Sequence, residues 1–199
     1  MVIAAEPNPL TLFRNWFDTV VSAGVVEPSA MVLATADGAG RPAARAVLLK
    51  GLDERGFRFF TNYASAKAGD LEVNPNCALA FVWPAVVRQV RVKGRAERVP
   101  NEESAAYFAT RPRGSQLGAW ASHQSEVIAD RGVLDRRLAE LEARYLAGEE
   151  VPRPPFWGGY VVVPDSIEFW EAADDRLHDR LRYRRTAPGE PWLVERLSP

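Results

Sequence analysis

Side chains suited to anion binding gather near the start of one predicted helix. Thr61, Ser65 and Lys67 fall at its beginning, where unpaired backbone N–H groups and partial positive charge favour a phosphate group. Arg45 and Lys50 lie upstream on one predicted strand. A capped surface helix with a solvated lysine would show the same residues, so this pattern alone leaves both interpretations open.

A second basic cluster lies between Tyr107 and Ser125, a stretch rich in hydroxyl groups and small residues. Arg111 and Arg113, with Ser115, are suited to clamp a second anion, because planar guanidinium groups match the geometry of phosphate oxygens. Exposed loop arginines are the alternative interpretation.

The segment RLHDR, residues 176–180, is a third candidate. Period-2 alternation in an extended strand predicts that Arg176, His178 and Arg180 share one face. Two positively charged side chains on either side of a histidine repel each other unless another group compensates their charge. We therefore expect this segment to face such a group.

The strand predicted over 88–99 is polar on one face. Alternation puts Val90 and Val92 on the buried face. The opposite face carries Gln89, Arg91, Lys93 and Arg95. Solvation alone accounts for the charged residues, and Gln89 has a different role only if a flat polar group lies nearby.

Several other chemistries are excluded by residue type. The sequence shows no Ser-His-Asp arrangement, no G-x-G-x-x-G after a strand and no P-loop. We expect no metal, because one cysteine (Cys77) and two histidines cannot form a zinc cage and the aspartates near His178 are mixed with arginine. A single cysteine also excludes an intramolecular disulfide, which favours a cytoplasmic location.

Composition and hydrophobic pattern indicate a single domain over 1–199 that is mainly β with flanking helices, either a barrel or a sandwich. The predicted helices are 9–24, 65–74, 101–110 and 126–146, and the predicted strands are 30–37, 43–54, 57–63, 77–84, 88–99, 160–172, 177–186 and 191–199. We expect the first three strands to form a meander and the leucine stripe of 126–146 to pack in the core.

With 25 basic and 26 acidic residues and a net charge of −1, no nucleic-acid or membrane partner is expected from bulk charge.

These stretches resemble the pyridoxamine 5′-phosphate oxidase family of flavin enzymes. The matches follow family order over nearly the whole chain, and GSQLGAWASHQS and RLHDR are the most specific. The matching runs are RAVLLK (45–50), FFTNYASAK (59–67), NP (74–75), FVW (81–83), RQVRVKG (88–94), ESAAYFATRPRGSQLGAWASHQS (103–125), PPFWGGY (154–160), IEFW (167–170), RLHDRLRY (176–183) and RLSP (196–199).

The resemblance implies an FMN-binding split β-barrel that forms a homodimer with FMN at the subunit interface, with a C-terminal dimerisation segment at about 157–199. The positions that match FMN contacts are Arg45, Val47, Lys50, Phe60, Thr61, Lys67, Gln89, Gln124, Ser125, Trp170 and Arg180. The positions that match substrate contacts are Lys50, Tyr107, Arg111, Ser115, Arg176 and His178. Of these, Arg176 and His178 are implied to be catalytic.

The implied reaction oxidises pyridoxamine 5′-phosphate and pyridoxine 5′-phosphate to pyridoxal 5′-phosphate with O₂, giving H₂O₂. A split-barrel flavin oxidase of the phenazine-biosynthesis type, acting on a dihydro-aromatic substrate, is the alternative. A non-catalytic flavin- or pyridoxal phosphate-binding module is a third. The GSQLGAWASHQS segment favours the vitamin B6 enzyme, and Arg176 with His178 disfavours a pure binding module.

The sequence departs from the family pattern at two places beside these positions. Trp170 is followed by Glu171 and Ala172 where Gln-Gly is usual. Ala66 stands beside Lys67 where a basic residue is frequent. We therefore expect a changed backbone near the flavin and one phosphate contact fewer.

Overall fold

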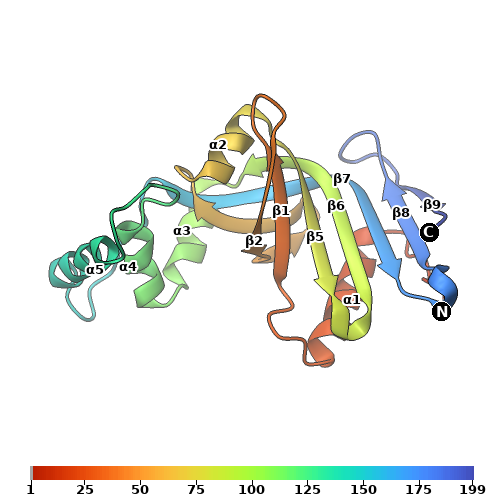
Figure 1. Cartoon of the computed structure of the whole chain (residues 1–199), viewed down its shortest axis with the longest axis horizontal. Helices are drawn as coiled ribbons and strands as arrows, with labels where there is room; N and C mark the ends of the chain where they lie inside the picture. The colour runs from red at the N-terminus through yellow and green to blue at the C-terminus, as the bar shows by residue number, and fades with distance from the viewer. Residues whose placement is uncertain (1) are drawn as a thin grey trace.

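The computed structural model describes residues 2–199, and its centre is one curved antiparallel sheet (Figure 1). The strand order is β2-β1-β5-β6-β7-β4-β3, with β8 paired to β7 and β9 paired to β8. The strands are β1 (Ala30–Ala36), β2 (Pro42–Leu48), β3 (Gly51–Asp53), β4 (Gly56–Asn62), β5 (Asn76–Trp83), β6 (Arg88–Arg98), β7 (Trp157–Glu171), β8 (Asp179–Arg184) and β9 (Leu193–Arg196).

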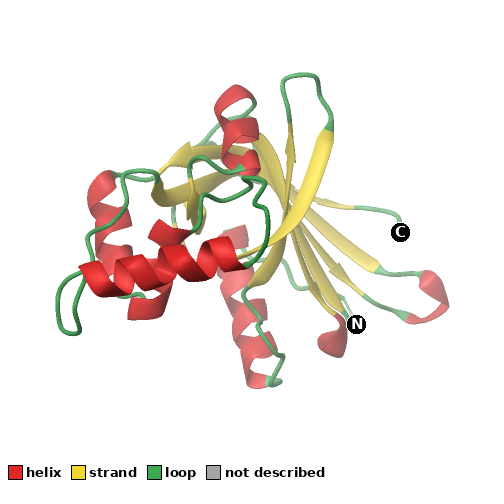
Figure 2. Ribbon diagram, turned by 60° about the vertical axis from the view of Figure 1, so that its left-hand side comes forward, coloured by secondary structure: helices red, strands yellow, loops and turns green. Residues whose placement is uncertain are grey.

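Helices flank this sheet, which confirms the predicted mainly β class with flanking helices. They are α1 (Pro9–Ser22), α2 (Ala66–Val73), α3 (Asn101–Ala109), α4 (Arg113–Ala121) and α5 (Gly132–Arg144), with short 3₁₀ turns η1 (Pro84–Val86) and η2 (Asp174–Arg176). Figure 1 shows α3, α4 and α5 at one end of the sheet, with β8, β9 and both chain termini at the other. Figure 2 shows the same group of helices beside the curved strands.

The core lies between α1 and the concave side of the sheet. Phe13 of α1 packs edge-on against Phe57 and Phe81, with ring centroids 4.9 Å away in both cases. Val90 and Val92 are fully buried, and Arg91 between them is exposed. The predicted alternation of β6 is therefore confirmed.

The predicted meander of the first three strands is confirmed in part, because the segment 43–54 pairs with β1 through β2 and with β4 through β3. β2 pairs with β1, whereas β4 pairs with β3 and β7, so β2 and β4 lie apart in the strand order. The chain changes its pairing partner at Leu49 and Lys50, whose N–H groups donate to the carbonyl oxygens of Ser29, just before β1, and of Arg58 in β4. The segment 43–54 therefore forms two strands, and Lys50 lies between them rather than on one strand with Arg45.

The segment predicted as a Gly/Ser-rich connection contains helix α4, and α5 starts at Gly132 rather than at Glu126. The leucine stripe of α5 also differs from expectation, because α5 has no buried residue and contacts α4 instead of the core. None of the helices within residues 2–199 is long and apolar enough to cross a membrane.

Candidate functional site

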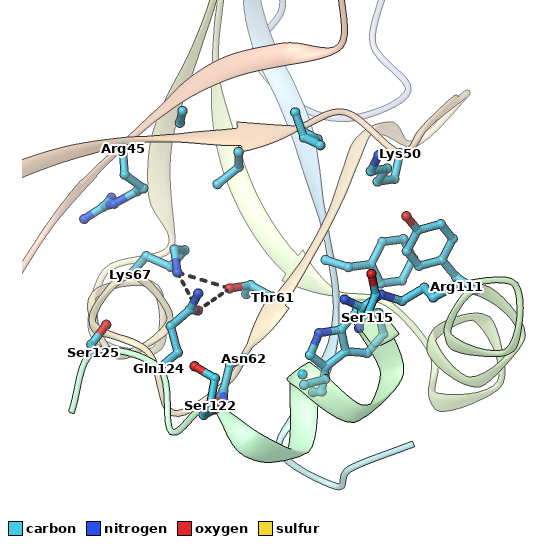
Figure 3. A pocket seen from close by; sticks show the side chains of 18 of the residues that line it. Arg45, Lys50, Thr61, Asn62, Lys67, Arg111, Ser115, Ser122, Gln124 and Ser125 are labelled. Atoms are coloured by element: carbon cyan, nitrogen blue, oxygen red, sulfur yellow. Dashed lines mark hydrogen bonds between the residues drawn. The ribbon is translucent and has the colours of Figure 1, made fainter. Parts of the chain in front are cut away.

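A cavity of about 720 Å³ opens between the sheet and helices α2, α3 and α4 (Figure 3). Strands β2 and β4 form one wall, and the chain that follows α4 closes one side. The lining residues are Arg45, Ala46, Val47, Leu48, Lys50, Phe60, Thr61, Asn62, Ala66, Lys67, Tyr107, Arg111, Ser115, Gly118, Ala119, Ser122, Gln124, Ser125 and Trp157.

The first cationic cluster of the cavity is centred on the buried Lys67. Its Nζ donates to Gln124 Oε1 at 2.9 Å, to Ser65 Oγ at 3.1 Å and to Thr61 Oγ1 at 3.2 Å. These partners are neutral, and no ion pair within residues 2–199 involves Lys67. Burial, followed by the charge of nearby Arg45, holds the pKa of Lys67 below its ordinary value of 10.5. An anion bound here would compensate both charges.

Arg45 is held in place by two residues from other elements. Its Nη1 donates to Thr35 Oγ1 at 2.6 Å, and the Thr35 hydroxyl donates to Asp70 Oδ2 at 2.5 Å. Asp70 Oδ2 also lies 3.7 Å from Arg45 Nη2. The guanidinium group is therefore oriented before any ligand binds, which lowers the cost of ordering it on binding.

Ser125 brings the chain after α4 to the start of α2. Its Oγ accepts a hydrogen bond of 3.2 Å from the Ala66 N–H, and its backbone is left-handed, with φ of +74°. The first N–H groups of a helix lack intrahelical partners and carry partial positive charge. Ser125 therefore caps the first N–H group of α2 and adds its hydroxyl to the cluster around Lys67.

The second cationic cluster lies across the cavity, where Figure 3 shows Lys50, Arg111 and Ser115 together. The Arg111 guanidinium stands 4.7 Å from the centre of the Trp157 ring. Its Nη1 is buried and has no hydrogen-bond partner in the described chain, and burial lowers the pKa of Arg111. A buried charged donor without a partner is costly, so this cluster is also suited to an anion.

Aromatic rings form a flat wall beside this second cluster. Phe60 stacks on Tyr107 with centroids 4.0 Å apart and on Trp157 with centroids 5.4 Å apart. Gly159 permits this stack, because a Cβ at that position would come within 2.7 Å of the Phe60 ring. Burial raises the pKa of Tyr107, which keeps its hydroxyl protonated as a donor.

Five of the residues at positions that match FMN or substrate contacts lie outside this cavity. Gln89, Trp170 and Arg180 are directly opposite one another across β6, β7 and β8. Arg180 donates to Glu168 Oε1 through Nε at 3.0 Å and through Nη2 at 2.8 Å. These residues form a row on one face of the sheet, apart from the cavity.

His178 and Arg176 belong to the same outlying group. The ring of His178 lies against Trp170, with centroids 4.7 Å apart, and its Nδ1 accepts a 3.2 Å hydrogen bond from the Ala173 N–H. Arg176 is exposed in η2 with a left-handed φ of +60°, before β8 begins. The prediction that Arg176 shares a regular strand face with His178 and Arg180 is therefore wrong. Figure 1 shows η2 at the end of the molecule opposite α3, α4 and α5.

Arg113 does not join Arg111 at the cavity. Its guanidinium donates to the carbonyl oxygens of Tyr145, Leu146 and Glu149, and so satisfies groups at the end of α5. Sequence reasoning also missed Trp157, Thr35 and Asp70. Trp157 lies in the PPFWGGY run, where a tryptophan before two glycines could have indicated a residue of the site. Nothing local in the sequence connects Thr35 or Asp70 to Arg45.

Comparison with protein families matches two segments of the chain. Residues 17–145 match the family described as pyridoxamine 5′-phosphate oxidase, and residues 157–199 match the pyridoxine 5′-phosphate oxidase C-terminal dimerisation region.

Several curated relatives match over almost the full length of the chain. The chain is 60% identical over 195 residues to the pyridoxine/pyridoxamine 5′-phosphate oxidase of Rubrobacter xylanophilus, covering 98% of this chain and 88% of that protein. It is 54% identical to the protein of the same name from Salinibacter ruber, covering 96% and 89%.

Two solved structures share the fold. PhzG from Burkholderia lata, in complex with tetrahydrophenazine-1-carboxylic acid, superposes with a TM-score of 0.91 at 35% identity, covering 98% of this chain and 94% of that one. A pyridoxamine 5′-phosphate oxidase-related, FMN-binding protein from Nostoc punctiforme superposes with a TM-score of 0.76 at 19% identity, covering 99% and 100%. The expected split-barrel fold is therefore confirmed.

Proposed function

The chain belongs to the pyridoxamine 5′-phosphate oxidase family, and on that premise we propose that its cavity is one part of an FMN-dependent active site for phosphorylated B6 vitamers. The protein oxidises pyridoxamine 5′-phosphate and pyridoxine 5′-phosphate to pyridoxal 5′-phosphate with O₂ as acceptor. The observation that carries this proposal is the pair of cationic clusters, around Lys67 and around Arg111, on two sides of one cavity.

The Lys67 cluster fits the phosphate of FMN. Lys67 and Arg45 supply two positive charges, while Thr61, Gln124 and Ser125 supply neutral polar groups at the start of α2. A phosphate dianion would offset the mutual repulsion of the two cations. Ala66 contributes no side-chain charge, and its N–H donates to Ser125 Oγ, so its part in this cluster is to hold Ser125 at the start of α2.

The Arg111 cluster fits the phosphate of the substrate. Lys50, Tyr107 and Ser115 line the cavity beside Arg111, and the free Nη1 of Arg111 is a donor without a partner in the described chain. The aromatic wall of Tyr107, Phe60 and Trp157 excludes water from one side of this cluster. We assign Lys50, Tyr107, Arg111 and Ser115 to the substrate phosphate, and Val47 and Phe60 to the cofactor.

Bound FMN supplies the redox chemistry, namely acceptance of a hydride equivalent from the 4′ carbon and transfer of two electrons to O₂ to form H₂O₂. The chain's own residues bind and orient. With the amine substrate, water then hydrolyses the imine to the aldehyde and ammonia, and the alcohol substrate gives the aldehyde directly.

The protein is a homodimer, and we assign the outlying residues to the site of a second copy. The row of Gln89, Trp170 and Arg180, with Arg176 and His178, does not line the cavity of its own chain. A two-fold symmetric dimer places the same surface of each copy at the other's site. The match of residues 157–199 to a dimerisation region supports this assignment, as it supports our proposal that the chain is one domain with its dimer contacts in this segment.

His178 acts in this assignment as a hydrogen-bond donor. Because its Nδ1 accepts from the Ala173 N–H, the neutral ring carries its proton on Nε2. The Nε2–H is then directed at the substrate, while the exposed guanidinium of Arg176 orients the substrate ring and stabilises negative charge on it.

The similarity to PhzG, whose structure was solved with tetrahydrophenazine-1-carboxylic acid, favours the alternative of a flavin oxidase acting on a dihydro-aromatic substrate. The relatives named pyridoxine/pyridoxamine 5′-phosphate oxidase are more similar in sequence, at 54% and 60% identity against 35%. The complete Arg111 cluster also favours a phosphorylated substrate. We further propose a cytoplasmic location, supported by the free, buried Cys77.

A direct assay tests the proposal. The FMN-loaded protein is given pyridoxamine 5′-phosphate, pyridoxine 5′-phosphate or a dihydrophenazine carboxylic acid in air, while aldehyde and peroxide are measured. We expect equal amounts of aldehyde and peroxide from both B6 substrates. FMN binding without peroxide from either of them, together with oxidation of the phenazine compound, would establish the alternative.

A further inference from the structure

Asp179 separates His178 from Arg180 at the first position of β8. Its side chain is only 10% exposed. Oδ2 accepts a 2.6 Å hydrogen bond from the Ile3 N–H, and both carboxylate oxygens accept from Arg196 Nη1, at 2.9 and 3.0 Å. Arg196 Nη2 donates back to the Ile3 carbonyl at 3.1 Å. This closed ring of contacts joins the N-terminal segment, β8 and β9.

A second contact ties the N-terminal segment to β8. The Tyr183 hydroxyl donates to the Glu6 carbonyl and accepts from the Glu6 N–H, at 2.9 Å in both cases. Ile3 itself is 4% exposed and belongs to the core. Residues 3–6 therefore lie fixed along β8. Asp179 holds the beginning of this segment at Ile3, and Tyr183 holds its end at Glu6.

The start of β8 is held from the C-terminal side as well. Arg180 Nη1 donates to the Ser198 carbonyl at 2.8 Å, and the Leu197 N–H donates to the Arg180 carbonyl at 2.9 Å. Upstream of His178 the backbone is left-handed at Asp175 and at Arg176, with φ of +54° and +60°. Such backbone is costly for residues other than glycine, so the surrounding contacts must fix the chain as it enters β8.

We propose that Asp179 is a positioning residue, whose carboxylate fixes the start of β8 so that His178 and Arg180 keep the orientation that the active site needs. The proposal rests on the function assigned to those two residues. It adds a role for Asp179, which does not line the cavity. Asp179 binds Ile3 and Arg196, whereas its neighbour Arg180 binds Glu168.

The matched test compares Asp179→Asn with Glu195→Gln. Glu195 accepts from Arg182 at 2.7 Å and from Arg184 at 3.0 Å, so it also forms ion pairs between β8 and β9, but away from RLHDR. Asparagine keeps an acceptor for the Ile3 N–H and loses the charge that pairs with Arg196. We expect Asp179→Asn to lower kcat by about tenfold or more, because misplaced groups at the reacting carbon are costly. KM should change little, since Arg111 holds the substrate phosphate. Glu195→Gln should stay near wild type in both, and equal kcat in the two variants would overturn the proposal.

A spectroscopic measurement tests the same point without the oxidase activity. The chain has two histidines, so His123→Asn leaves His178 as the single source of imidazole ¹⁵N signals. We expect the His178 signals of the wild-type background to show an unprotonated Nδ1. Asp179→Asn should shift or broaden them, whereas Glu195→Gln should not. Unchanged His178 signals in Asp179→Asn would contradict the proposal, even if kcat fell.

Two outcomes separate this proposal from others. If Asp179→Asn does not fold, Arg196→Gln removes the same ion pair from its half-exposed partner, and the same change in the His178 signals is expected. If the wild-type protein oxidises no B6 substrate but Asp179→Asn alone perturbs His178, the positioning role stands and the proposed function fails.

Discussion

Trp170 and His178 lie against each other, with ring centroids 4.7 Å apart, and neither lines the cavity that holds Lys67 and Arg111. The residues matched to catalysis and those matched to phosphate binding therefore occupy two separate places on one chain. The composite site that we propose for the homodimer accounts for this separation, because each copy would present its Trp170 face to the cavity of the other.

Arg111→Ala should weaken substrate binding and leave FMN binding nearly unchanged. A hydrogen bond to a charged group contributes about 1.5–3 kcal/mol, so KM for pyridoxamine 5′-phosphate should rise about 10–100-fold. Steady-state kinetics and flavin fluorescence titration measure the two affinities. Arg113→Ala is the control, since Arg113 contacts carbonyl oxygens at the end of α5: it should lower Tm and leave KM unchanged. An equal loss of both affinities in Arg111→Ala would refute the assignment.

FMN affinity should fall at alkaline pH through Lys67. Its folded pKa is lowered by burial and by Arg45, so the apoprotein loses this proton before pH 10.5, and phosphate binding favours the protonated form. Between the lowered pKa of Lys67 in the folded apoprotein and its ordinary value of 10.5, the unfolded chain binds more protons than the folded chain. Across this window the contribution of Lys67 to the stability of the apoprotein therefore rises with pH, while the affinity for FMN falls. Titrations of FMN across this window should show the decline in wild type and in Lys93→Met, whose lysine is exposed. A decline of the same size in Lys67→Met would exclude Lys67 as its source.

Thr35→Val should weaken FMN binding although Thr35 does not line the cavity. The buried hydroxyl accepts from Arg45 and donates to Asp70, and valine removes this link without changing charge. A hydrogen bond of this kind contributes about 0.5–1.5 kcal/mol, so Kd for FMN should rise about 2–10-fold. Thr19→Val is the matched control, because the Thr19 hydroxyl only donates to the Asn15 carbonyl on the exposed side of α1. Equal Kd values for both variants would mean that Arg45 needs no such support.

Gly159→Ala should destabilise the protein through the aromatic wall. The added Cβ would come within 2.7 Å of both Phe60 and Val99, and such overpacking costs about 1–3 kcal/mol. Gly69→Ala, in the middle of α2 with no atom within 4 Å of the added Cβ, should instead stabilise by up to about 1 kcal/mol. Thermal unfolding of the two variants checks both signs; a Tm for Gly159→Ala at or above wild type would contradict the packing of Phe60 against β7.

Local patterns predicted the elements and the residues whose roles depend on near neighbours. The alternation of apolar and polar residues predicted that Val90 and Val92 are buried. Successive side chains of a strand point to opposite faces, so one buried face determines the face of every residue. The Lys67 cluster was also predictable, since Thr61 and Ser65 lie within six positions of Lys67 along the chain.

Contacts between distant segments could not be predicted, because local sequence patterns do not show which distant segments pair. The pairing of β4 with β7 joins segments about a hundred residues apart, and no local pattern in Phe57 to Asn62 distinguishes it from pairing with β2. Helix α4 was missed because Gly114 and Gly118 weaken its helical signal. Arg113 looked equivalent to Arg111 in sequence, yet the helix that begins at Arg113 directs it to the end of α5.

Complementation between two impaired chains is the decisive measurement for the composite site. Arg111→Ala damages the cavity, and Arg176→Ala damages the outlying group, so neither homodimer should oxidise pyridoxamine 5′-phosphate efficiently when its concentration is near the wild-type KM. When the two chains are unfolded, mixed equally and refolded together, half of the dimers should be mixed, and each mixed dimer should have one intact site. We predict recovery of about a quarter of wild-type activity. A mixture no more active than the average of the two parent variants would show that Arg111 and Arg176 serve the same site from one chain, and would contradict the composite site.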